Sequence, residues 1–152
     1  MDSNDLKVVK HLMEKARTSW AELGAILGLS APAAADRVHK MEEMGIIKGY
    51  SALINPDEVG CGLAALISVT LERTEQRKEF LTMVNNLPEI LECHHIAGEE
   101  DYILKVRCSG TRDLEFLISE KIKSLSGMKT RTTIILSTVK ETPILPIKVE
   151  RG

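Results

Sequence analysis

Residues 19–40 have the sequence SWAELGAILGLSAPAAADRVHK, in which two short helical patterns are separated by a glycine turn. Ser19 and Glu22 have the spacing of a capping box, in which each side chain satisfies a free backbone N–H group at a helix start. Gly28 is expected to end the first helix, because glycine adopts the left-handed conformation without a steric penalty. Ser30 is the N-cap of the next helix. Two helices joined by a tight glycine turn predict a helix-turn-helix.

Apolar residues at helical spacing predict the buried sides of three helices in residues 1–45. These residues are Leu6, Val9, Leu12, Met13 and Ala16 in the first helix, Leu23, Ile26 and Leu27 in the second, and Ala34, Val38, Met41 and Met44 in the third. Gly45 is expected to end the third helix. Residues 1–45 are therefore predicted to be a helix-turn-helix DNA-binding domain.

Residues 46–60 are predicted to be a linker. Their first part, IIKGYSALI over residues 46–54, predicts a strand or β-ribbon with a kink at Gly49. The turn sequence Asn55-Pro56-Asp57 ends it.

Residues 61–140 carry a strand–helix–strand pattern twice, which predicts a ferredoxin-like βαββαβ domain with an antiparallel sheet. Strands are expected over residues 63–71, 90–97, 102–108 and 129–138, with helices over about 75–87 and 113–125. Both helices should cover one face of the sheet. The other face is then apolar and uncovered, so a second copy of the domain is expected to pack there. The fold class is α+β, and residues 141–152 form a C-terminal tail.

Composition favours a soluble globular protein, with 43% hydrophobic and 28% charged residues. No apolar run approaches the roughly 20 residues that span a bilayer, and the polar, acidic start is unlike a secretory signal. The three cysteines are scattered and odd in number, which fits reduced thiols. We therefore expect a cytoplasmic protein without membrane contact.

The predicted third helix would enter the major groove of double-stranded DNA. The net charge of −2 does not by itself indicate a nucleic-acid partner, so the positions of the cations matter. Arg37 offers a bidentate fork to guanine or phosphate, and small side chains let the helix sit deep in the groove. The expected DNA contacts are Arg17, Ser30, Ala33, Ala34, Arg37, His39, Lys40 and Lys48. The same stretch is also typical of an alanine-rich packed helix with a solvated face.

Acidic residues follow Gly98 in the sequence GEEDY over residues 98–102, where a strand meets a turn. They are suited to the ammonium group of an amino acid, and equally to an ordinary acidic turn. His94 and His95 lie nearby, but adjacent strand residues point to opposite faces and do not easily share a metal ion. No nucleophile motif or glycine-rich phosphate loop is present. No catalytic residue, metal or cofactor is therefore expected.

In their order and spacing, strings along nearly the whole chain resemble the Lrp/AsnC family of transcription regulators. The N-terminal strings are Asp5, Arg17-Thr18-Ser19, Glu22-Leu23, Gly28-Leu29-Ser30, Arg37-Val38, Met41-Glu42, residues 45–52 and Asn55-Pro56. The C-terminal strings are Gly98 with Asp101-Tyr102, and Ser137-Thr138-Val139-Lys140. Two features depart from the family pattern: the alanine-rich third helix, and Glu99-Glu100 in place of an Asp-aromatic pair.

The resemblance implies a winged-helix-like DNA domain, a β-ribbon and an amino-acid-sensing domain, and no enzyme activity. It implies homodimers paired through their sheets and an octamer of four dimers. The effector would bind between dimers near Gly98, Glu100, Asp101 and Tyr102, with Thr133 and Ile135 facing the same pocket.

Two other functions stay open at this point. Siroheme decarboxylases resemble the same two-domain plan, although no histidine or arginine cluster suits a tetrapyrrole here. An interaction module that has lost DNA binding would also fit the net negative charge of the N-terminal part.

Overall fold

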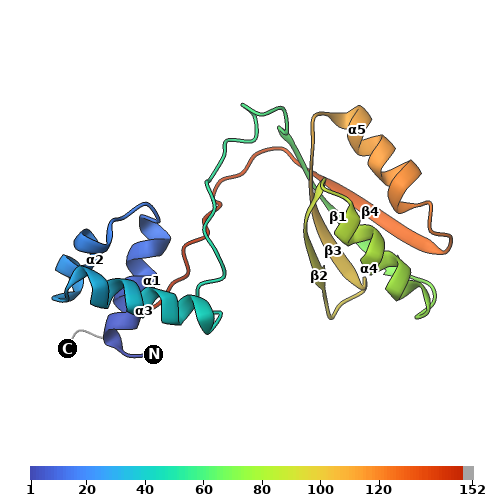
Figure 1. Cartoon of the computed structure of the whole chain (residues 1–152). Helices are drawn as coiled ribbons and strands as arrows, with labels where there is room; N and C mark the ends of the chain where they lie inside the picture. The colour runs from blue at the N-terminus through green and yellow to red at the C-terminus, as the bar shows by residue number, and fades with distance from the viewer. Residues whose placement is uncertain (149–152) are drawn as a thin grey trace. The chain divides into compact units, whose positions relative to one another are not determined.

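Three capped helices form the first of two units into which the chain divides (Figure 1). The computed structural model describes residues 1–148. The helices are α1 (Ser3–Glu14), α2 (Trp20–Leu27) and α3 (Ala31–Glu43). Among the described residues, this unit comprises Met1–Ala52 and 140–148, and Leu53–Val139 form the second unit.

The core of the first unit confirms the helix-turn-helix prediction and corrects its details. The fully or nearly buried residues are Val8, Leu23, Ala34, Val38 and Met41. Val8 was missing from the predicted apolar side of the first helix, whereas Ala16 lies beyond the end of α1 and is exposed. Ile26 and Met44 are also exposed, because the helices are too short and too few to cover a full apolar stripe.

Two glycines shape the turn between α2 and α3. Gly28 has a φ of 67°, the left-handed conformation expected at a helix end. Gly24 is buried inside α2, and a Cβ atom there would lie 2.6 Å from the carbonyl oxygen of Leu29. The close approach of α2 to the start of α3 therefore requires glycine at position 24.

The predicted β-ribbon does not form in this chain. Residues 46–54 have no strand structure, because a strand needs a neighbour for its hydrogen-bond ladder and the four-stranded sheet has none beside this segment. Ile46 and Ile47 instead donate backbone hydrogen bonds to the Met41 carbonyl and pack on the first core.

The tail after the sheet belongs to the first unit. Within it, the backbone N–H of Leu145 lies 3.4 Å from the Met13 sulfur on α1. The predicted tail runs to residue 152, and its last four residues lie outside the described part of the chain.

The second unit is the predicted antiparallel βαββαβ domain, with strand order β2-β3-β1-β4. The elements are β1 (Leu63–Leu71), α4 (Gln76–Asn86), β2 (Ile90–His95), β3 (Tyr102–Cys108), α5 (Thr111–Phe116), the π-helical turn η1 (Leu117–Ile122) and β4 (Met128–Ile135). Both helices lie on one side of the sheet (Figure 1). The main core fills the space between these helices and the sheet, and includes Ile67, Phe80, Leu104 and Leu117.

The other face of the sheet, here called the open face, is less apolar than predicted. Directly paired residues of neighbouring strands share a face, and the register therefore places Leu66, Lys105 and Thr133 together on the open face. Leu66 is 37% exposed. Lys105 forms an ion pair with Glu92 there, so the open face mixes apolar and charged side chains. No helix among residues 1–148 is long and apolar enough to cross a membrane.

We predict that Gly24→Ala destabilises the first unit by about 1–3 kcal/mol, because the new methyl group collides with backbone that cannot move freely. Gly110→Ala is the matched control: its φ of −174° is extended, and a Cβ there meets nothing within 4 Å. Because Gly110 lies in the second unit, denaturant unfolding is followed by the fluorescence of Trp20, the one tryptophan, for the first unit and by far-UV circular dichroism for both units. Equal stability of the two variants would refute the close-approach argument.

Candidate nucleic-acid interface and effector loop

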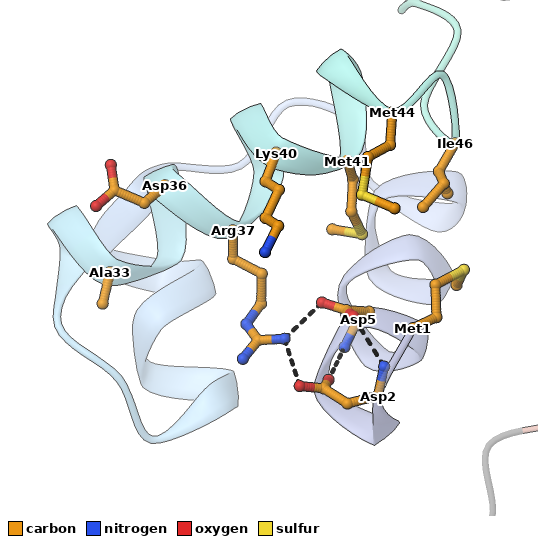
Figure 2. A pocket seen from close by; sticks show the side chains of 10 residues that line it. All are labelled: Met1, Asp2, Asp5, Ala33, Asp36, Arg37, Lys40, Met41, Met44 and Ile46. Carbon is orange, nitrogen blue, oxygen red and sulfur yellow. Dashed lines mark hydrogen bonds and ion pairs between the residues drawn. The ribbon is translucent and has the colours of Figure 1, made fainter.

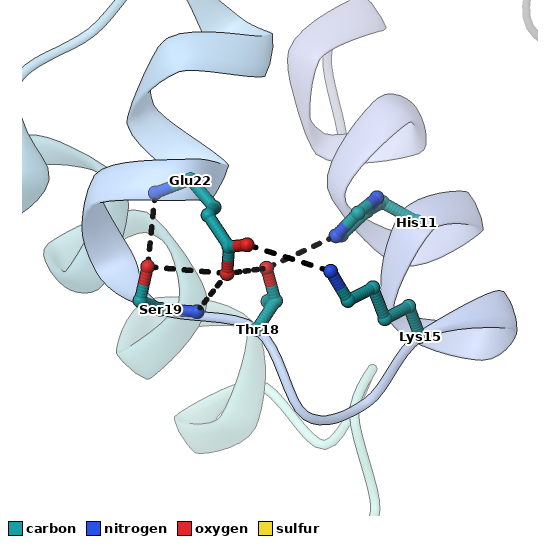
Figure 3. A network of polar contacts seen from close by, with 5 residues as sticks. All are labelled: His11, Lys15, Thr18, Ser19 and Glu22. Atoms are coloured by element: carbon teal, nitrogen blue, oxygen red, sulfur yellow. Dashed lines mark hydrogen bonds and ion pairs between the residues drawn. The ribbon is translucent and has the colours of Figure 1, made fainter.

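The start of α2 is held by a polar network centred on Glu22 (Figure 3). Ser19 and Glu22 form the predicted capping box: the Ser19 N–H donates to Glu22 Oε2 at 2.8 Å, and the Glu22 N–H donates to Ser19 Oγ at 3.1 Å. Thr18 donates to the same carboxylate, and Lys15 on the α1 side lies 3.4 Å from Glu22 Oε1. The network thus ties the first helix of the motif to the end of α1.

The start of α3 is capped as predicted, but one expected DNA contact is excluded. The Ser30 hydroxyl accepts from the Ala33 N–H at 3.3 Å. Ala34 is completely buried against the first core and cannot touch DNA. Ala33, the residue before Ala34, is half-buried and faces a different side of α3. The alanine-rich sequence therefore serves helix packing at position 34.

Arg37 points back into the domain rather than outward (Figure 2). Its Nη1 donates to Asp2 Oδ2 at 2.7 Å and to Asp5 Oδ1 at 2.5 Å. Asp2 and Asp5 also form the capping box of α1. The hydrogen bond from the Asp5 backbone N–H is the main cause that holds the pKa of Asp2 below its ordinary value, and the hydrogen bond from Arg37 is the next. The sequence pattern alone did not predict this contact, although Asp2 and Asp5 have capping-box spacing.

Four of the expected polar contacts are exposed: Arg17, His39, Lys40 and Lys48. His39 and Lys40 lie on α3, and the His39 ring meets the edge of Trp20 with centroids 5.5 Å apart. Arg17 lies in the connection between α1 and α2, and Lys48 follows α3. Of the expected basic contacts, these four remain accessible to a phosphate backbone.

The acidic loop before β3 is attached to the sheet by Asp101. Its carboxylate accepts from the Leu71 N–H at 2.7 Å, and its own N–H donates to the Val69 carbonyl at 3.0 Å. The next residue, Tyr102, is only 3% exposed, with its ring 4.8 Å from Phe80 on the helix-covered face. Within this chain, the Asp101 carboxylate is therefore bonded to the sheet and the Tyr102 ring belongs to the core.

The other expected effector residues do not converge within one chain. Glu100 forms an ion pair with Arg131 of β4, a contact that cannot be predicted without the strand register. A side chain at Gly98 would meet only Ile96, at 3.8 Å. Thr133 and Ile135 pair with Leu66 and Ala64, toward the opposite end of β1 from Asp101.

The histidine pair does not form a metal site. His94 contacts Glu92 at 3.0 Å, whereas the His95 ring stacks on Tyr102 with centroids 4.9 Å apart. The two rings thus have different partners, as the alternation of strand side chains predicts. No cluster of three or more potential metal ligands occurs within residues 1–148.

Both units of the chain match domains of known proteins. Residues 1–48 match the model for a winged helix-turn-helix DNA-binding domain, and residues 64–145 match the Lrp/AsnC ligand-binding domain. The chain belongs to the Lrp/AsnC family. It is 36% identical to the HTH-type transcriptional regulator LrpA of Mycobacterium tuberculosis, over 91% of each chain. The chain itself is therefore a transcription regulator and not an enzyme, and the decarboxylase alternative is set aside.

Two solved structures of Lrp/AsnC relatives also resemble the chain. A transcriptional regulator of Neisseria meningitidis in complex with L-methionine has a TM-score of 0.91 and 29% identity, covering 96% of each chain. A feast or famine regulatory protein of M. tuberculosis complexed with L-methionine has a TM-score of 0.86 and 36% identity, covering 92% of this chain and 95% of the other.

We predict that Arg37→Gln lowers the free energy of unfolding of the first unit by about 1 kcal/mol, because it removes a partly buried ion pair that joins α3 to α1. The matched control is Lys40→Gln on the same helix, which should change stability by less than about 0.5 kcal/mol. Urea unfolding followed by Trp20 fluorescence separates the two. If Lys40→Gln proved as destabilising as Arg37→Gln, the ion pair would not be what holds α3.

A second prediction concerns the pKa of Glu22, which hydrogen bonds from Ser19 lower to about 2. Because this pKa is lowered, the network stabilises the fold above the ordinary value of 4.5 and loses its contribution as pH falls through about 2. Ser19→Ala should raise the pKa of Glu22 partway toward 4.5, whereas Ser30→Ala, at the other N-cap, should not. An NMR pH titration of the glutamate carboxyls tests both, and an unmoved Glu22 in Ser19→Ala would contradict the assignment.

Proposed function

We propose that this regulator binds specific double-stranded DNA through the exposed side of α3, and that an amino acid shifts its assembly or DNA affinity. The proposal depends chiefly on one observation: a capped helix-turn-helix presents His39 and Lys40 to solvent. We place the protein in the cytoplasm, where DNA is accessible.

The proposed DNA contacts are a subset of the residues expected from sequence. His39 approaches the major groove, Lys40 contacts phosphate at its edge, Arg17 and Lys48 contact further phosphates, and Ser30 with Ala33 lies at the helix start. Ala34 and Arg37 are assigned to packing and positioning instead, because the core and the two aspartates occupy them. Few cations per chain imply modest affinity for one site, so useful binding requires several copies acting together.

The proposed effector site requires more than one chain. The loop at Asp101 lies level with Val69 and Leu71, whereas Thr133 and Ile135 lie level with Leu66 and Ala64. At 3.3 Å per residue, these groups are separated by roughly 10–23 Å along β1. Residues of one chain thus leave the pocket incomplete, and the second half would come from a neighbouring copy. We therefore propose a homodimer joined through the open face and an octamer of four dimers.

Glu100 and Arg131 are suited to the two charged groups of an amino acid. Their ion pair lies at the edge of the loop, with Arg131 68% exposed. A zwitterion can replace this pair, with its ammonium on Glu100 and its carboxylate on Arg131. Ligand binding then acts on DNA affinity only through a difference in affinity between two states of the assembly.

The experiment is a DNA-binding titration with the region upstream of the protein's own gene, repeated across salt concentrations and with a panel of amino acids. We expect salt-dependent binding that one amino acid shifts by about 5- to 150-fold. Glu100→Gln should abolish the shift, whereas the matched control Glu99→Gln should retain it.

Two results would contradict the proposal. Absence of salt-dependent DNA binding under every condition would favour an interaction module that only assembles with a relative. An undiminished amino-acid response in Glu100→Gln would remove the loop from the effector site.

A further inference from the structure

A pocket of about 400 Å³ lies between the start of α1 and α3, within the first unit (Figure 2). A volume of this size lies at the lower end of small-molecule sites. It is remote in sequence from the loop over residues 98–102, and the proposed effector site makes no use of it. Its lining residues are Met1, Asp2, Asp5, Ala33, Asp36, Arg37, Lys40, Met41, Met44 and Ile46.

One side of the pocket separates opposite charges. Asp2 and Asp5 share the Nη1 group of Arg37, and each carboxylate keeps acceptor capacity beyond the bonds it makes there. Lys40 forms no ion pair within residues 1–148, and Figure 2 shows its ammonium group turned toward the same cluster. A free cation thus lies beside two carboxylates.

The other side of the pocket is apolar. Met41 is only 2% exposed and forms its floor, whereas Met44 and Met1 are more than half exposed at its edge. Ile46 completes this wall after α3 ends. Methionine side chains adapt to apolar groups of different shapes.

We propose that this pocket binds an α-amino acid with an apolar side chain, as a second small-molecule site in the DNA-binding unit. The carboxylate of the ligand contacts Lys40, and its ammonium contacts Asp2 and Asp5. Its side chain packs on the methionine wall. A zwitterion matches the separated charges, whereas an apolar ligand without charges would leave polar groups buried and unpaired.

Occupancy would also affect DNA binding, a consequence that depends on the proposed function. Lys40 is one of the proposed DNA contacts, so a bound carboxylate would compete with DNA for its ammonium group. The C-terminal effector loop plays no part in this competition.

The test is methyl NMR of the full chain labelled at its methionine methyl groups, titrated with L-leucine. The six methionines divide by position: Met1, Met41 and Met44 line the pocket, Met13 lies on α1 outside it, and Met83 and Met128 belong to the second unit. We expect saturable shifts at Met41 and Met44. 3-Methylbutylamine, which lacks the carboxylate, and 4-methylpentanoate, which lacks the ammonium, should each bind more weakly than L-leucine.

Lys40→Gln should weaken L-leucine binding at Met41 and Met44 about tenfold, because it removes a charge-assisted contact. The matched control Lys7→Gln, an exposed site on α1 outside this pocket, should leave it unchanged. Absence of saturable shifts at Met41 and Met44, or equal affinity in the two variants, would overturn the proposal. Shifts confined to Met83 or Met128 would also overturn it, while leaving the C-terminal effector site intact.

Discussion

The contact of Arg37 with Asp2 and Asp5 holds α3, the helix that we propose to bind DNA, against the start of α1. It joins the middle of α3 to the capped start of α1, so that the third helix cannot rotate without breaking an ion pair of 2.5–2.7 Å. The close approach at Gly24 holds the other end of α3 against α2. With α3 held at both places, His39 and Lys40 remain on the solvent side. The arrangement explains how a unit of little net charge keeps Lys40 exposed on α3.

The second unit is constrained by β1, which pairs with β3 on one side and β4 on the other. This central strand separates the acidic loop from Thr133 and Ile135. A site built from the acidic loop together with Thr133 and Ile135 therefore requires neighbouring copies. Ligand binding there would depend on the assembly of those copies. In the assembly that we propose, ligand binding and oligomerisation are linked by mass action rather than by a pathway through one chain.

The sequence predicted the fold well because its local signals are strong: capping residues at Ser19 and Ser30, the turn at Gly28, and alternation along Tyr102–Cys108. It failed where tertiary packing decides. The roles of Arg37 and Ala34 depend on which side of α3 meets α1, and helical spacing alone does not distinguish a core alanine from a groove alanine. The contact of Arg131 with Glu100 and the burial of Tyr102 could be predicted only with knowledge of the strand register. Residues 46–54 form no ribbon because they have no partner strand.

The most direct measurement is the slope of log DNA affinity against log salt for the unmodified chain, Arg37→Gln and Lys40→Gln, below the unfolding temperature of each. Each phosphate contact contributes a slope of about −0.9. If Lys40 contacts phosphate and Arg37 only positions α3, Lys40→Gln makes the slope shallower by about 0.9 per bound subunit and Arg37→Gln leaves it unchanged. A shallower slope in Arg37→Gln, with none in Lys40→Gln, would show that Arg37 itself binds DNA and would contradict this account.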